Sequence, residues 1–191
     1  RHMKYFTYEL IAASNGWIEQ DKRAVNRATK RMETAVRQYQ QELESLKTRI
    51  SQPAWKFFRY GFEDKGLHDA RLLSFQIGDG LDYKPDGKAP FRLNAQRTSV
   101  ELEFLNYEQD LHYLFQLRGI SSVSCNLFRE EHSYAKSIGD LYIYELTQAD
   151  KDNLRLGFLF ASGATIVAEF QRLVFRMTRL QRRYEIGEMY D

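Results

Sequence analysis

The chain has 191 residues, of which 43% are hydrophobic and 28% are charged, with a formal net charge of +2. This composition supplies a hydrophobic core and excludes wholesale disorder, and three Pro and 11 Gly exclude collagen-like and low-complexity chains. Its single Cys excludes a disulfide framework and a multi-Cys zinc site.

No apolar run in the sequence approaches the ~20 residues that a membrane-spanning helix requires. The opening Arg1-His2-Met3 is typical of a cloning remnant before a native Met3, so we leave Arg1 and His2 out of the functional interpretation. We therefore expect a soluble, cytoplasmic protein.

The segment from Asp21 to Ile50 carries the clearest periodic pattern of the chain. Its apolar residues recur at steps of three, four or seven, as one face of an α-helix requires. They are Val25, Met32, Val36, Tyr39, Leu43, Leu46 and Ile50. The pattern predicts a helix of about 28 residues, capped by Asn15 or Asp21 and ended by Pro53. Its apolar face must be covered by the rest of the chain or by a second copy in a homodimer.

Shorter helices are predicted on either side, from about Lys4 to Ala13 and from about Pro53 to Tyr60. After Lys65 the pattern changes to alternation, which is typical of strands. The predicted strands are Arg71–Ile77, Ser99–Leu105, Leu111–Leu117, Val123–Phe128, Leu141–Leu146, Leu154–Ala161 and Ala164–Phe170. We expect Arg118-Gly119 to close the third of them, and Ser162-Gly163 to join the last two as a hairpin.

Helices first and strands afterwards predict an α+β fold: a helical region over residues 1–64, followed by an antiparallel sheet or sandwich over residues 65–191 with a basic C-terminal tail. The tail after Phe170 has two interpretations. It continues as a strand and then forms a short helix, which we favour, or it turns into an amphipathic basic helix at once.

Candidate catalytic and metal-binding groups are few. His68 beside Asp69 suggests a base and its orienting carboxylate, but adjacent strand residues point to opposite faces, so we interpret them as a structural pair in which Arg71 meets an outer-face acid. Glu130-Glu131-His132 has no second His at metal-ligand spacing and is typical of a solvated loop. Cys125 alternates with apolar neighbours and is expected to face the core. We therefore predict no catalytic, cofactor-binding or metal site.

Charge is distributed unevenly along the chain. Between Asp21 and Arg49 there are eight Lys and Arg against four Asp and Glu, whereas Thr98 to Asn153 has four against ten. An acidic middle rich in tyrosine would suit a basic protein partner, because Tyr buries a large area at low entropic cost. The candidate partner-binding residues are Tyr107, Tyr113, Glu130, Glu131, Tyr134, Tyr142 and Tyr144.

The basic residues of the long helix and tail are the alternative, since they could follow nucleic-acid phosphates. The candidates are Arg23, Arg27, Lys30, Arg31, Arg172, Arg176, Arg179 and Arg183. A solvated helix surface explains the same pattern. A third hypothesis, a small hydrolase or metal enzyme, needs His68 and Asp69 to converge with Glu131 and His132 in a pocket.

Four segments carry a family resemblance: the leader Met3 to Thr7, the long helix, the Leu67 to Arg71 strand entry and the Phe158 to Gly163 hairpin. Together they resemble a family of uncharacterised bacterial proteins with an N-terminal helical part and a C-terminal β-rich part, and the β-rich part is similar to small proteins that neutralise a cognate toxin. The resemblance implies no catalytic residues. We therefore expect a non-enzymatic protein-binding module, an immunity protein for a bacterial toxin, with nucleic-acid binding as the alternative.

Overall fold

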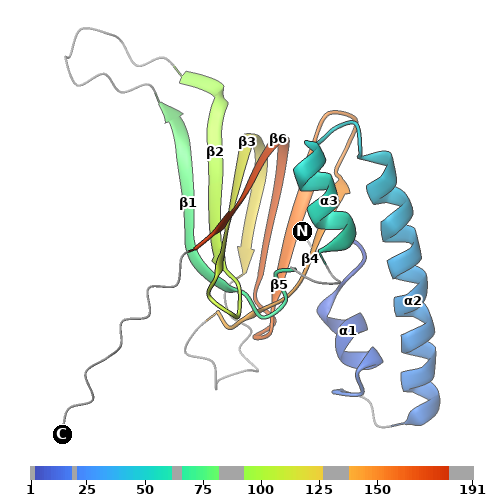
Figure 1. Ribbon diagram of the computed structural model, residues 1–191. Helices are drawn as coiled ribbons and strands as arrows, with labels where there is room; N and C mark the ends of the chain where they lie inside the picture. Colours follow the sequence, from blue (N-terminus) through green and yellow to red (C-terminus); the bar gives the residue numbers. More distant parts are fainter. Residues whose placement is uncertain (1–2, 19–20, 62–65, 82–92, 127–137, 181–191) are drawn as a thin grey trace, which may run out of the picture.

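The computed structural model describes residues 3–18, 21–61, 66–81, 93–126 and 138–180. Three helices come first and a six-stranded antiparallel sheet follows, which confirms the predicted α+β class (Figure 1). The helices are α1 (Tyr8–Ser14), α2 (Lys22–Ser45) and α3 (Gln52–Tyr60). The strands are β1 (Arg71–Leu81), β2 (Leu93–Leu105), β3 (Leu111–Asn126), β4 (Leu141–Gln148), β5 (Leu154–Phe160) and β6 (Thr165–Arg179).

The long helix α2 is shorter than predicted. Asp21 caps its start, accepting from the backbone N–H groups of Arg23 and Ala24, and Leu46 is its C-cap. Pro53 does not end this helix but lies in the first turn of α3, where its missing N–H costs no hydrogen bond. The apolar pattern therefore predicted the position of the helix correctly, but it extended the helix through the turn that follows Leu46.

The apolar face of α2 packs on the chain's own sheet. Tyr39, Leu43 and Leu46 are buried in the common core, and Met32 and Val36 pack against it while partly exposed. The hydrophobic surface of these side chains is thus removed from water within one chain. Covering this face requires no second copy.

The sheet has the strand order β1-β2-β3-β6-β5-β4, and every neighbouring pair is antiparallel. The predicted hairpin at Ser162-Gly163 joins β5 to β6, as expected. The predicted break at Arg118-Gly119 is wrong, because β3 continues through it. Gly119 adopts φ +68°, and an irregularity in the pairing with β6 follows between Ile120 and Ser122. A glycine in this conformation lets one strand bend without ending.

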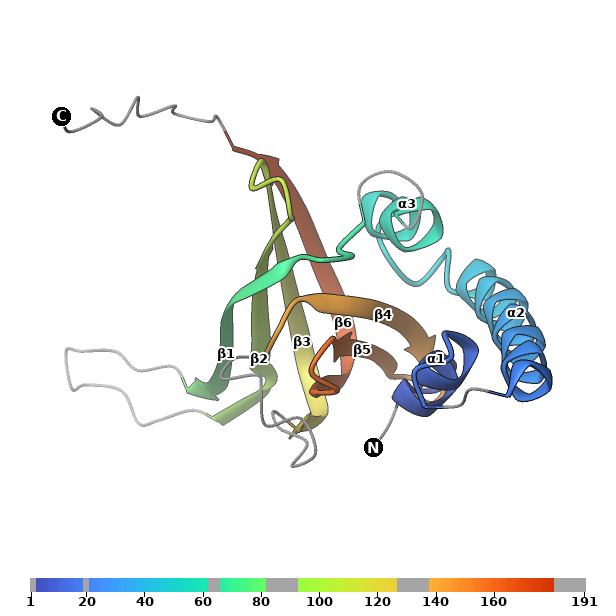
Figure 2. The same cartoon turned by 90° about the horizontal axis from the view of Figure 1, so that it is seen from below.

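The sheet is rolled, and Figures 1 and 2 show its strands curving around an interior. The rings of Phe104 on β2 and Phe158 on β5 lie 5.0 Å apart, although two strands separate β2 from β5 in the sheet. The two edge strands also approach each other at one end. The backbone N–H of Asp69 donates to the Leu141 carbonyl at 2.8 Å, and the Leu141 N–H donates to Ala70 at 2.8 Å.

An aromatic cluster around Phe57 of α3 attaches the helices to this interior. Its ring lies 5.6 Å from Tyr113, 5.4 Å from Tyr144 and 4.5 Å from Phe175, measured between ring centroids. Tyr113 and Tyr144 are 0% and 1% exposed, so the expectation that both lie on a partner-binding surface is wrong. Alternation placed them on the inward face of their strands, where large aromatic rings contribute most to the core.

Two further expectations concern the strands. The favoured interpretation, that the strand runs on past Phe170, is confirmed, because β6 continues to Arg179. The alternative, a helix that begins at once, is wrong, and residues 181–191 lie outside the described residues. Cys125 is exposed and not buried, because it lies near the end of β3 beyond the bend. Among the described residues, no helix is long and apolar enough to cross a bilayer.

Candidate functional site

A cavity of about 490 Å³ lies between the three helices and strand β4. We call it the helix–sheet cavity. Its volume falls within the range of roughly 300–1,000 Å³ that is typical of small-molecule sites. The lining residues are Phe6, Ile11, Ser14, Asn15, Met32, Val36, Tyr39, Gln40, Leu43, Phe58, Arg59, Gly61, Gly66, His68, Tyr142, Ile143 and Tyr144.

The inner wall of the cavity is apolar and rigidly held. Phe6, Leu43 and Phe58 are at most 2% exposed, and Phe6 packs edge-on against Tyr39 with ring centroids 5.2 Å apart. The Tyr39 hydroxyl accepts a hydrogen bond from the Leu146 backbone N–H at 3.3 Å. Side chains fixed by packing and hydrogen bonds keep a site formed before a ligand arrives, which reduces the entropic cost of binding.

Two glycines close one end of the cavity. A Cβ atom on Gly66 would lie 2.0 Å from the Gly61 carbonyl oxygen, and one on Gly61 would lie 2.9 Å from the Tyr144 hydroxyl. The end of α3 and the chain entering β1 can therefore approach each other only because both positions lack a side chain. This close approach brings α3 against the wall formed by β4.

Polar and aromatic side chains form the rim. Asn15 Nδ2 donates to the Tyr142 hydroxyl at 2.9 Å, which ties the end of α1 to β4. The Tyr142 ring also meets Trp17 edge-on at 5.5 Å and the His68 ring at 5.4 Å. Trp17 is 54% exposed, so the rim offers an aromatic surface to solvent.

Arg59 and His68 are the basic side chains of the described lining. Arg59 lies in the last turn of α3 and is half-buried, and His68 lies just before β1 with its Nδ1 3.0 Å from Asp69 Oδ2. No Asp or Glu occurs among the described lining residues. An apolar interior with basic groups at its edge favours ligands that carry a negative charge.

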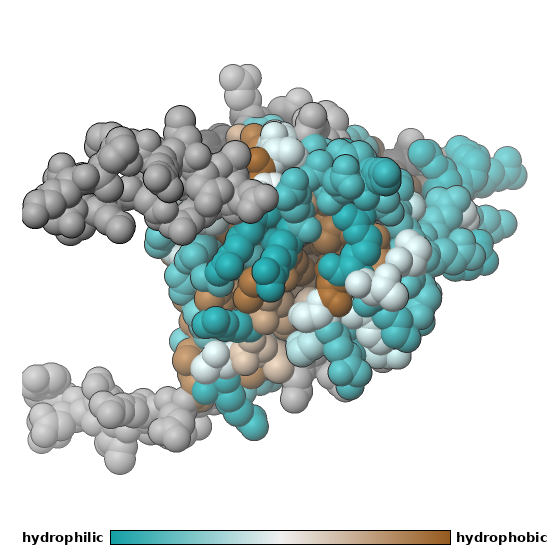
Figure 3. Space-filling model, turned by 90° about the horizontal axis from the view of Figure 1, so that it is seen from above, coloured by the Kyte–Doolittle hydropathy of each residue, from teal (hydrophilic) through white to brown (hydrophobic). Residues whose placement is uncertain are grey.

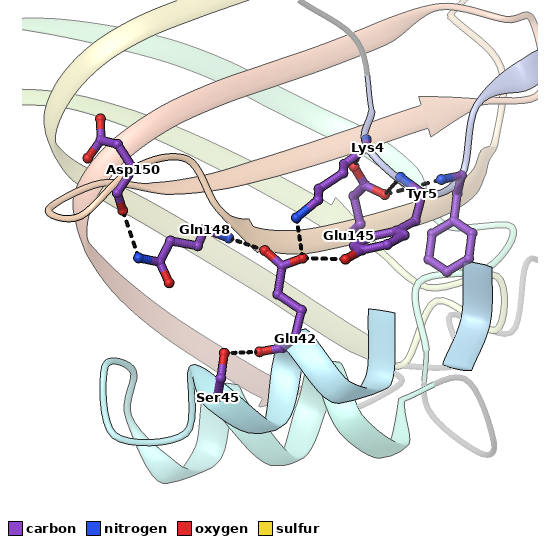
Figure 4. A network of polar contacts seen from close by, with 8 residues as sticks. Lys4, Tyr5, Glu42, Ser45, Glu145, Gln148 and Asp150 are labelled. Atoms are coloured by element: carbon purple, nitrogen blue, oxygen red, sulfur yellow. Dashed lines mark hydrogen bonds and ion pairs between the residues drawn. The ribbon is translucent and has the colours of Figure 1, made fainter. Parts of the chain in front are cut away.

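Beyond the cavity, β4 is joined to the helices by a polar network that we call the N-terminal seam (Figure 4). The Glu145 carboxylate is buried and accepts the backbone N–H groups of Lys4, Tyr5 and Phe6, the latter two at 2.9 and 3.2 Å. Burial raises the pKa of Glu145 and outweighs these hydrogen bonds, which act in the opposite direction. The seam fixes the start of the chain against β4.

Glu42 of α2 completes the seam. Its carboxylate accepts from Lys4 Nζ at 2.6 Å, from the Tyr5 hydroxyl at 2.5 Å and from the Gln148 backbone N–H at 2.9 Å. Burial alone would raise the pKa of Glu42, but these donors hold it below its usual value. Figure 4 shows the donors converging on this carboxylate from the N-terminal segment and β4.

The predicted partner-binding residues do not form one surface. Tyr107 is 77% exposed in the turn between β2 and β3, whereas Tyr142 lies at the rim of the cavity. Tyr113 and Tyr144 lie in the core, as described above. The other three predicted residues, Glu130, Glu131 and Tyr134, lie outside the described residues.

The predicted nucleic-acid-binding residues fall into two groups. Arg23, Arg27, Lys30 and Arg31 are exposed on α2, and Arg172, Arg176 and Arg179 are exposed on β6. Figures 1 and 2 place α2 and the end of β6 on opposite sides of the molecule. Arg183 lies outside the described residues. The fold therefore does not combine the two groups into one basic surface.

The two described histidines, His68 and His112, have separate local partners. His68 and Asp69 lie in a turn before β1, where Asp69 adopts φ +60°, so the expectation that they point to opposite faces of a strand is wrong. Arg71 lies 3.6 Å from Asp140, the predicted type of contact. His112 Nε2 lies 2.8 Å from Glu103 Oε2, and His132 is outside the described residues.

Over the described part of the chain, no three His, Cys, Asp or Glu side chains are grouped so that they could hold a metal ion. Comparisons with protein-family models, with curated proteins and with solved structures find no match for this chain. What the site can do must therefore be argued from its own geometry.

The sequence interpretation missed Glu145 and Arg59. Glu145 interrupts the apolar run Leu141–Leu146, and a charge within such a run indicates a buried hydrogen-bonded group. Arg59 follows three aromatic residues of α3 and has no comparable signal. Its importance depends on how α3 lies against β4, which local pattern does not specify.

Proposed function

We propose that the chain is a non-enzymatic binding protein whose binding site is the helix–sheet cavity. The observation that supports this proposal is the preformed hollow of about 490 Å³ between the helices and β4. A hydrophobic core of this size would close around such a hollow unless the surrounding side chains were held apart, since interiors are normally close-packed. Here the seam and the two glycines hold the walls in place.

The test is binding of an uncharged apolar probe, N-phenyl-1-naphthylamine, followed by its fluorescence. We expect saturable binding at one site per chain. Val36→Trp, on the α2 wall, should fill the cavity and weaken binding at least tenfold. Gln38→Trp adds the same ring to the exposed surface of the same helix and should leave binding unchanged.

Folding of both variants is checked by thermal unfolding and by near-ultraviolet circular dichroism. If Val36→Trp is too unstable, Met32→Trp repeats the test one helical turn away on the same wall. Absence of saturable binding to the unmodified chain would contradict the proposal, and so would equal binding by the folded wall variant and the control.

A protein partner is the second candidate, and an exposed apolar surface on the strands favours it. The register places Ile77 opposite Val100 and Met177 opposite Tyr113, on the inward face, yet Ile77 and Met177 are 58% and 48% exposed. Leu73 is also exposed. Figure 3 shows apolar surface in the middle of the upper face, bordered by hydrophilic side chains. Exposed apolar side chains bordered by polar ones are typical of protein interfaces.

We propose accordingly that this surface binds a protein, and that the partner is a bacterial toxin which the chain neutralises by covering its active site. Titration calorimetry with the product of the adjacent gene tests this, and we expect nanomolar affinity. Ile77→Asp with Met177→Asp should weaken binding at least thirtyfold, whereas Thr178→Asp, also exposed on β6, should not. No binding by the unmodified chain would contradict a toxin encoded next to it.

A further inference from the structure

We propose that the helix–sheet cavity binds a small anionic amphiphile, with its apolar body between α2 and β4 and its anionic group at Arg59. This inference rests on the proposed function, since it names the class of ligand that the same cavity takes. Its support is the chemistry of the lining: an apolar interior, with the guanidinium of Arg59 at its edge.

Among the described residues, Arg59 has no acidic partner. Its guanidinium lies over the ring of Tyr60, 5.4 Å from the centroid, and makes no ion pair with any residue of the described part of the chain. Other arginines of the chain do find carboxylates: Arg155 binds Glu169 at 2.7 Å. A half-buried guanidinium beside an apolar cavity is a suitable partner for a carboxylate, sulfonate or phosphate, because its planar donors bind two oxygens at once.

His68 lies at the same end of the cavity. Only the short approach of Gly61 to Gly66 separates the end of α3, which carries Arg59, from the segment that carries His68. The Asp69 carboxylate contacts the Nδ1 atom of His68 through Oδ2. The imidazole therefore adds a second nitrogen donor or acceptor to the lining of the same cavity, on an exposed residue, whereas Arg59 is half-buried.

The remaining polar lining groups do not favour a cation. Ser14 Oγ already donates to the Ile11 carbonyl at 2.9 Å, and Asn15 donates to Tyr142. No carboxylate is available among the described lining residues to balance a positive ligand. A cation would thus lose its hydration next to Arg59 without gaining a partner, whereas an anion would gain one.

Two probes that share an apolar body test the inference. 8-Anilinonaphthalene-1-sulfonate and N-phenyl-1-naphthylamine carry the same ring systems, and only the first has an anionic group. We expect the sulfonate to bind about tenfold more tightly, the effect of one charge-assisted hydrogen-bonded contact. Arg59→Gln should remove this difference and leave the affinity for the uncharged probe within about twofold of its original value.

Matched variants separate charge at the site from charge elsewhere. Arg59→Lys keeps the charge and should restore part of the difference, whereas Arg23→Gln removes an exposed charge on α2 and should change nothing. Decanoate and 2-naphthoate are then used to displace the sulfonate, which distinguishes an aliphatic from an aromatic body. Inorganic phosphate, which has no apolar body, should not displace it.

Equal affinity for the two probes, or a difference that persists in Arg59→Gln, would overturn the inference while leaving the proposed function intact. If neither probe binds, the proposed function itself fails. The two results are therefore distinguishable within one set of titrations.

Discussion

Strand β4 meets the helical layer at two neighbouring places that are built differently. At the N-terminal seam, Glu145 and Glu42 accept hydrogen bonds from the start of the chain and from Gln148. At the helix–sheet cavity, Tyr142 and Ile143 of the same strand face a hollow of about 490 Å³. One half of β4 is thus held to the helical layer by hydrogen bonds, and the other half can line a cavity.

The difference shows how a fold can keep a cavity from collapsing. Apolar walls alone would move together, because closing the hollow removes hydrophobic surface from water. The seam prevents this at one end by fixing the distance between α2 and β4 through Glu42 and Gln148. We therefore interpret the seam as structural and the cavity as functional, and the predictions below test that division.

Breaking the seam should have the largest effect. Glu145→Leu leaves three backbone N–H groups without their acceptor and should lower the free energy of unfolding by about 3 kcal/mol or more. Glu145→Gln keeps one acceptor oxygen and should cost less. Urea unfolding monitored by circular dichroism measures both. A loss below about 1 kcal/mol for Glu145→Leu would contradict the structural role of the seam.

Truncating neighbouring apolar residues of β4 compares packed and open surroundings directly. Leu146 is fully buried, and Leu146→Ala should cost about 3 kcal/mol as a cavity-forming substitution. Ile143 is partly exposed and already faces the hollow, so Ile143→Ala should cost about 1 kcal/mol. The same unfolding assay applies. Equal costs for the two would indicate that the cavity is closed in solution.

The acid dependence of stability should reveal the ionised half of the seam. The pKa of Glu42 is lowered in the folded chain, so its contribution to stability is present above the unfolded value of 4.5 and is lost as pH falls through the folded pKa. Glu145, with a raised pKa, contributes in the opposite sense: its contribution is present below 4.5 and is lost as pH rises through the folded pKa.

Glu42→Gln should therefore flatten the acid limb of the stability profile. We expect the variant to be less stable than the unmodified chain at pH 7, by about 1 kcal/mol, and to approach it below pH 4. Urea midpoints measured from pH 3.5 to 7 provide the comparison. Parallel profiles for the two proteins would mean that another carboxylate determines the acid limb; Glu33→Gln, on the exposed face of α2, is the control.

Local sequence pattern was sufficient to predict the helices and strands that this comparison concerns, but not which of them pack against each other. The spacing of Tyr39 and Leu43 predicted the buried face of α2, and alternation predicted β4 and the β5–β6 hairpin. Periodicity identifies an inward face, however, and does not say what lies opposite. For that reason Tyr113 and Tyr144 were expected at a partner surface when they pack against Phe57.

Local sequence pattern could not predict the cavity either, because it does not specify which elements contact one another. Its wall combines residues from four elements and the two glycines that end α3 and precede β1. The bend of β3 is a second feature that local pattern does not specify, because the Arg118-Gly119 pair predicts the end of a strand, whereas β3 continues through it. One positive-φ glycine within a strand cannot be distinguished by sequence from a turn.

The smallest expected effect concerns charge outside both regions. Arg27 and Arg31 are exposed on α2, beyond the lining of the helix–sheet cavity, so Arg27→Glu with Arg31→Glu should leave binding of N-phenyl-1-naphthylamine within about twofold.

The same Arg27→Glu, Arg31→Glu variant tests the nucleic-acid alternative, which requires salt-dependent binding of DNA or RNA that the charge reversal weakens. Fluorescence anisotropy with labelled oligonucleotides at 25 and 200 mM salt measures this binding. Because the end of β6 lies on the opposite side of the molecule from α2, Arg176→Glu with Arg179→Glu should then act independently of the α2 pair. Steep salt dependence that is lost in the α2 variant would make nucleic acid the partner and move the functional surface from the cavity to the outer face of α2.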